Sequence, residues 1–153
     1  MVTEVKMNQR VLYETDFVLW SETTAQQLRN QHYDRVDWEN LIEEIEDMSR
    51  RERKALKSNL IVVLLHLLKW QHQTEMRSGS WRGSMREHRR QVNDDLQDSP
   101  SLVSYVQELL TLCYGNAREQ AADETGLAID VFPSDCPYTI AQILNPEFLP
   151  DRV

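Results

Sequence analysis

The residues best suited to chemistry gather in one stretch of the chain, residues 66–90, which reads HLLKWQHQTEMRSGSWRGSMREHRR. It holds three of the four histidines, two of the four tryptophans and six Lys or Arg residues. Guanidinium groups beside indole rings suit phosphates and unstacked bases. Imidazoles suit transition metals. The stretch therefore admits a nucleic-acid interface, a metal site, or the basic part of a helical scaffold.

The tryptophans and arginines form a candidate binding face. It comprises Trp70, Arg77, Trp81, Arg82, Arg86, Arg89 and Arg90. The last four arginines recur at helical spacing, so they could contact phosphates together. They could equally form ion pairs with acidic residues of the preceding helix or of another copy of the chain. Those partners would be Glu39, Glu43, Glu44 and Glu46. We favour these ion pairs, with the arginines pointing outwards, and keep nucleic-acid contact as the alternative.

The histidines are a weaker candidate, for a metal site. A metal needs several donors that converge at about 2 Å from the ion. His66 and His88 fall on consecutive helices and could meet if these helices run antiparallel. His72 lies six residues after His66 and so on another face of the helix. Because no HExxH motif is present, we expect no metal and no cofactor, and His66 with His88 remains the weak alternative for a metal-dependent enzyme.

The acidic run EEIED, from Glu43 to Asp47, could in principle supply paired carboxylates for acid–base catalysis. It falls in the early turns of a helix with many Lys and Arg residues nearby, which indicates a solvated or ion-paired face. The sequence has no Gly-rich phosphate loop and no nucleophile beside a base. We therefore expect no catalytic residue and lean towards a protein that is not an enzyme.

The elements that position these residues are helical. Apolar residues recur every three or four positions, and only four Gly and five Pro are present. The predicted helices cover about residues 16–29, 38–73, 82–96, 100–125 and 139–145. The predicted caps are Asp16, Ser99 before Pro100, a capping box of Thr139 with Gln142, and Gly126 as a left-handed C-cap. Ser49 and Glu52 form a capping-box pattern that could break the long helix. The sequence predicts an all-α fold, a bundle of four main helices plus a short C-terminal helix, with a flexible tail over residues 1–12 and a single domain over 13–150.

Charge divides the chain into three parts. Residues 1–49 carry four bases and eleven acids, residues 50–90 eleven bases and three acids, and residues 91–153 two bases and eleven acids, giving −7, +8 and −9 and the total of −8. Acidic arms folded against a basic middle would neutralise one another. No apolar run is long enough to cross a membrane. Two cysteines with no metal or disulfide spacing indicate reduced thiols of a cytoplasmic protein.

Several strings together resemble one family. They are DWENLIEEIE from residue 37, HLLKWQ from 66, SWR from 80, MREHRR from 85, DSPSL from 98 and CPYTIAQIL from 136. In this order, over roughly residues 12–150, they resemble the Domain of Unknown Function 29 family, which is abundant in cyanobacteria. The resemblance implies an α-helical bacterial protein and carries no activity. The leading hypothesis is a non-enzymatic interaction or scaffold protein with a protein partner or a second copy, and the alternative is a nucleic-acid-associated or antitoxin-like regulator.

Overall fold

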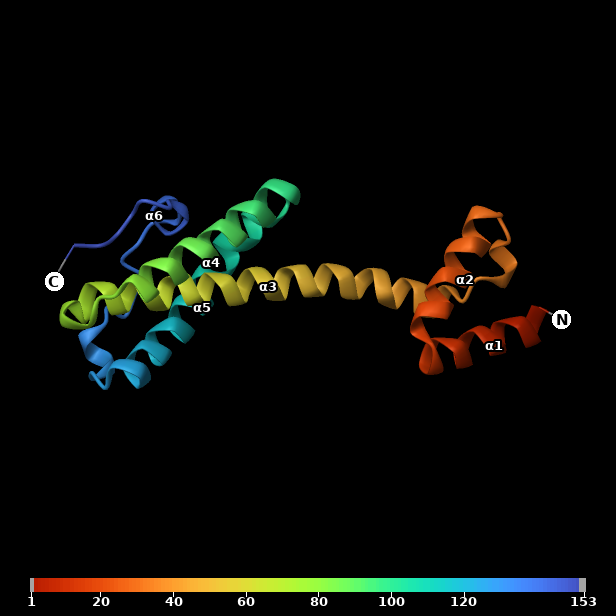
Figure 1. Ribbon diagram of the computed structural model, residues 1–153, viewed down its shortest axis with the longest axis horizontal. Helices are drawn as coiled ribbons and strands as arrows, with labels where there is room; N and C mark the ends of the chain where they lie inside the picture. The colour runs from red at the N-terminus through yellow and green to blue at the C-terminus, as the bar shows by residue number, and fades with distance from the viewer. Residues whose placement is uncertain (1, 152–153) are drawn as a thin grey trace. The chain divides into compact units, whose positions relative to one another are not determined.

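The computed structural model describes residues 2–151, with the side chains of residues 4, 5 and 8–151. This range forms six α-helices and no strand, so the all-α prediction is confirmed (Figure 1). The helices are α1 (Val2–Thr15), α2 (Phe17–Arg29), α3 (Trp38–His72), α4 (Gly79–Asp98), α5 (Leu102–Thr125) and α6 (Ile140–Leu144). Contacts divide the chain into two compact units, Met1–Arg50 and Arg51–Val153.

The first unit holds α1, α2 and the start of α3. The segment predicted as a tail is helical in the structure, because one side of α1 packs on α2: the ring centroid of Tyr13 lies 4.8 Å from that of Trp20. The flexibility expected for residues 1–12 and the single domain expected over residues 13–150 stay predictions. Asp16 caps α2 as expected, since its Oδ1 accepts from the backbone N–H of Leu19 at 3.0 Å.

The long helix α3 runs without interruption from Trp38 to His72, so the break considered at Ser49 does not occur. Asp37 precedes it and is buried. Its two carboxylate oxygens accept from the backbone N–H of Asn40 at 3.4 Å and from the side-chain amide of Asn40 at 2.6 Å. This carboxylate therefore satisfies a backbone donor that the first helical turn leaves without an intrahelical partner.

The second unit is built around the C-terminal part of α3, with α4 and α5 packed along it (Figure 1). Two predicted boundaries were wrong. Helix α4 begins at Gly79 instead of near Arg82, because the Ser78 side chain accepts from the Trp81 backbone N–H and caps the helix earlier. Helix α5 begins at Leu102 instead of Pro100, because the chain enters it through a tight turn in which Leu102 N–H donates to the Ser99 carbonyl.

The ends of α5 and α6 follow the sequence signals. Gly126 caps α5 in the left-handed conformation with φ of 72°, which glycine adopts without steric cost. Thr139 and Gln142 form the predicted capping box at α6, and Asn145 follows that helix. The short α6 packs against α4, and Arg82, Arg86 and Arg89 of α4 lie beside the segment that follows α6.

Candidate functional site

The two tryptophans of the candidate face are already in contact with cations of their own chain. The Arg77 guanidinium lies 4.7 Å from the centroid of the Trp70 ring, and its Nε donates to the Trp70 carbonyl at 2.9 Å. The Lys69 ammonium lies 4.5 Å from the centroid of the Trp81 ring and pairs with Glu124 at 3.0 Å. One face of each indole is therefore covered, which leaves less aromatic surface for stacking bases.

Two arginines of α4, Arg86 and Arg90, pair with carboxylates close to them, and among the described side chains neither pairs with a glutamate of α3. Ion pairs with another copy of the chain stay a prediction. Arg90 pairs with Glu87 at 2.7 Å and Asp94 at 2.9 Å, neighbours one turn away on the same helix. Arg86 lies 3.7 Å from Glu147. The glutamates of α3 have partners in the first unit, as described below.

Arg89 contradicts the prediction that these arginines all point outwards, because it is 1% exposed. Its guanidinium donates to three backbone carbonyls, those of Ile143 at 2.8 Å, Phe148 at 2.8 Å and Gln142 at 3.3 Å. These carbonyls belong to α6 and the segment after it, so Arg89 fixes that segment on α4. Burial, together with the charge of Arg86, lowers the pKa of Arg89 to about 10.

A hollow of about 300 Å³ lies beside this buried guanidinium. The first half of α4 forms one wall, and the segment from Pro146 to Leu149 forms the other. Arg82, Arg86 and Arg89 line it together with Glu147. The structure thus brings three of the predicted arginines to one cavity and leaves Arg90, Trp70 and Trp81 outside its lining.

The histidines do not converge on an ion. His88 Nδ1 lies 2.7 Å from the Asn59 side-chain oxygen. The His66 ring centroid lies 6.5 Å from that of Trp81, and His66 Nδ1 is buried without a hydrogen-bond partner. Burial, and secondarily the charge of Lys69, lowers the pKa of His66. Among the residues that the structure describes, no group of three or more His, Cys, Asp or Glu side chains could hold a metal.

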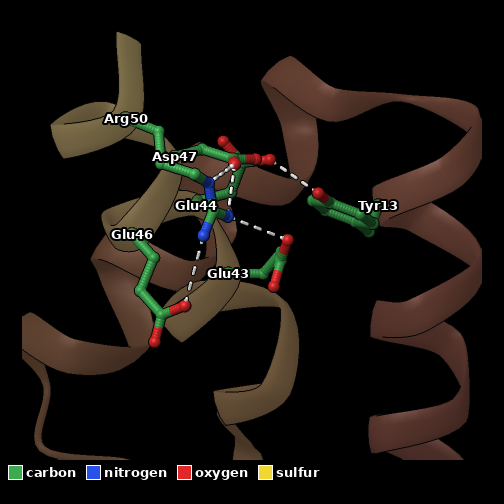
Figure 2. Close-up of polar contacts among 6 residues, drawn as sticks. All are labelled: Tyr13, Glu43, Glu44, Glu46, Asp47 and Arg50. Atoms are coloured by element: carbon green, nitrogen blue, oxygen red, sulfur yellow. Dashed lines mark hydrogen bonds and ion pairs between the residues drawn. The ribbon is translucent and has the colours of Figure 1, made fainter. Parts of the chain in front are cut away.

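The acidic run of α3 surrounds a cation (Figure 2). Arg50 pairs with Glu43 at 3.1 Å, Glu46 at 3.5 Å and Asp47 at 2.5 Å. The Tyr13 hydroxyl donates to Glu44 at 2.6 Å, which raises the pKa of Tyr13 to about 12. Arg10 of α1 pairs with Glu39, which lies in the first turn of α3 before the acidic run. Four of these carboxylates thus pair with exposed cations and Glu44 accepts from a tyrosine, an arrangement typical of an ion-paired helix face.

An apolar face of α3 was not predicted as a site from the sequence. Trp38, Ile42, Ile45 and Met48 are 43%, 52%, 54% and 60% exposed. At 100° per residue they cover a sector about 120° wide. The sequence carried a signal, because these apolar positions lie among the acidic residues Glu39 to Asp47.

A comparison with family models identifies the chain. The model for the domain of unknown function DUF29 matches residues 12–149. The chain belongs to the DUF29 family. No curated protein and no solved structure matches this DUF29 chain. Within the described residues of the DUF29 chain, no helix is both long and apolar enough to cross a membrane.

Proposed function

We propose that this DUF29 protein is a non-enzymatic helical interaction protein that self-associates through the apolar face of α3, defined by Trp38, Ile42, Ile45 and Met48. The observation that carries the proposal is the exposure of these four large apolar side chains on one side of a helix. Large exposed apolar patches on soluble proteins mark interaction sites.

The first unit supports the proposal because it has little core of its own. Among its described side chains the buried apolar ones are Trp20 and Val36, whereas the second unit has a large cluster of buried apolar residues. Three buried side-chain atoms of this unit have no hydrogen-bond partner: Gln9 Oε1, Trp20 Nε1 and Gln27 Oε1. Small units with so little buried apolar surface usually need a partner to be stable. A second protein surface packed on the apolar face of α3 would be such a partner.

The charges of α3 favour a second copy of the same chain as the partner. Residues 39–47 carry five carboxylates and no base, whereas residues 50–57 carry five bases and one carboxylate, giving −5 and +4. Two copies of this helix paired antiparallel would place each acidic stretch beside a basic one, whereas a parallel pair would place like charges together. Charge complementarity of this kind selects both partner and orientation.

Nucleic-acid binding is the less supported alternative. The tryptophans that would stack bases are covered by Lys69 and Arg77, and the chain is acidic overall at −8. A cytoplasmic location is part of the proposal and is supported by the two free cysteines, Cys113 and Cys136.

Light scattering coupled to size-exclusion chromatography tests the proposal on the full chain. We expect a mass of about twice 18.1 kDa at micromolar concentration, falling towards 18.1 kDa on dilution. A mass of 18.1 kDa at every concentration up to about 1 mM would refute self-association, because a specific dimer is populated at that concentration.

A further inference from the structure

We propose that the hollow between α4 and the segment Pro146–Leu149 is a binding site for a small dianionic oxyanion, the phosphate group of a phosphate monoester or free phosphate. This site lies in the second unit and does not depend on the self-association proposed above. Its lining contains Arg82, Arg86, Arg89 and Glu147, which sum to a charge of +2. A dianion would balance this charge.

The arginines of the hollow are not neutralised by the protein. Arg89 is buried, and its hydrogen bonds go to carbonyl groups, which carry no net charge. Arg82 has no carboxylate within ion-pair distance among the described side chains. Arg86 has Glu147, at 3.7 Å and with both side chains more than 60% exposed, so this pair is weak and easily exchanged. Planar guanidinium groups bind phosphate oxygens through two parallel hydrogen bonds, which suits the exposed Arg82 and Arg86. The buried Arg89 contributes its positive charge beside them.

The start of α4 adds to the positive potential and keeps the hollow open. Gly79 is the first residue of the helix and lines the hollow, so the positive end of the helix dipole lies there. Gly83 lines it one turn later. Apart from the chain neighbours and the backbone of the helix itself, a Cβ atom built at either glycine has no atom within 4 Å. The open space beside these glycines leaves room for an anion next to the helix backbone.

The remaining lining favours a small ligand over a nucleic acid. Met85, Pro146 and Leu149 form apolar parts of the wall, and neither tryptophan lines the hollow. A volume of about 300 Å³ suits one phosphate with a small organic group, at the lower end of small-molecule sites. The lining holds no Ser, Thr, Cys, His or Lys side chain, and Glu147 is its one carboxylate, so it suits binding without chemical conversion.

Isothermal titration calorimetry with inorganic phosphate and with phenyl phosphate, at constant ionic strength, tests the site. We expect saturable binding of one anion per chain, and Arg82→Gln should weaken it roughly tenfold, the effect of losing one charge-assisted pair. Arg90→Gln is the matched control on the same helix, outside the lining, and should change the affinity less than about twofold. Tighter binding of phenyl phosphate would assign the ligand as a monoester, and equal binding would assign it as free phosphate.

Gly83→Ala provides a second, independent test of the phosphate site. The added methyl occupies part of the hollow without a clash, so it should weaken phosphate binding while slightly stabilising the helix. Gly115→Ala on α5 also meets no atom within 4 Å and controls for helix propensity. The proposal is overturned by the absence of saturable heat up to about 10 mM phosphate, by equal losses in the Arg82 and Arg90 variants, or by an oligonucleotide that binds the same arginines more tightly than either phosphate.

Discussion

Replacing Ile42 and Ile45 together by Asp should convert the protein from dimer to monomer. Each isoleucine is about half exposed in the single chain, at 52% and 54%. Full burial of an isoleucine is worth about 1.5–3 kcal/mol, so covering the exposed half contributes roughly 1 kcal/mol per side chain. A symmetric dimer contains four of these side chains. The double substitution therefore removes about 4 kcal/mol of association free energy, a factor of roughly 1000 in Kd, and it also places carboxylates against the acidic stretch of α3.

The assay is sedimentation velocity over a hundredfold range of concentration, with circular dichroism to verify that the variant remains helical. Leu112→Asp is the matched control, because Leu112 is 51% exposed on α5 in the second unit and lies outside the proposed contact face. We expect the control to sediment as the unaltered protein does. If the double variant retains the dimer with an unchanged Kd, or if the Leu112 variant dissociates equally, the apolar face of α3 is not the contact surface.

Three further perturbations have defined outcomes. In the antiparallel pair that sets residues 39–47 of one copy beside residues 50–57 of the other, the two helices cross near Met48, so Met48→Cys should form an intermolecular disulfide under mild oxidation. Trp38→Cys, on the same apolar face ten residues away, should not cross-link, whereas a parallel pair would cross-link at both positions. Arg89→Met leaves three carbonyls without their donor, so the free energy of unfolding, measured by urea denaturation, should fall by about 3 kcal/mol or more. Arg90→Met, at an exposed position, should change it by less than about 0.5 kcal/mol. Burial lowers the pKa of His66 below its unfolded value, so the unfolded state binds more protons, and the free energy of unfolding decreases as the pH falls from about 6.5 towards the folded pKa. His66→Gln should reduce this dependence of the unfolding free energy on pH in urea titrations. An unchanged dependence would contradict the lowered pKa of His66.

The helical fold could be predicted from the sequence because its signals are local. Asp16, Thr139 and Gly126 each satisfy or terminate a helix through atoms within a few residues, and the structure has these caps where the sequence placed them. Errors arose at boundaries where two local signals compete. At α4 the Ser78 cap starts the helix earlier than predicted. At α5 the turn closed by the hydrogen bond from Leu102 N–H to the Ser99 carbonyl starts the helix later than predicted.

Residue types and spacing also identified the arginine segment, but they could not say which arginine is buried. Arg82, Arg86, Arg89 and Arg90 are equivalent in the sequence, all on one polar helix. Arg89 differs because three carbonyls more than fifty residues away converge on its guanidinium. That convergence is a property of how α6 and its following segment pack on α4, and no local pattern encodes it.

The sequence by itself determined the helical periodicity, the caps and the alternation of acidic and basic stretches, because each depends on neighbours along the chain. The tertiary structure decided which apolar residues are core. Leu56, Leu60 and Leu64 of α3 are buried, whereas Ile42 and Ile45 on the same helix are about half exposed. Periodicity assigns a residue to a helix face, but burial requires another element against that face. The second unit supplies that element for its part of α3, and within the first unit nothing covers Ile42 and Ile45 to the same extent.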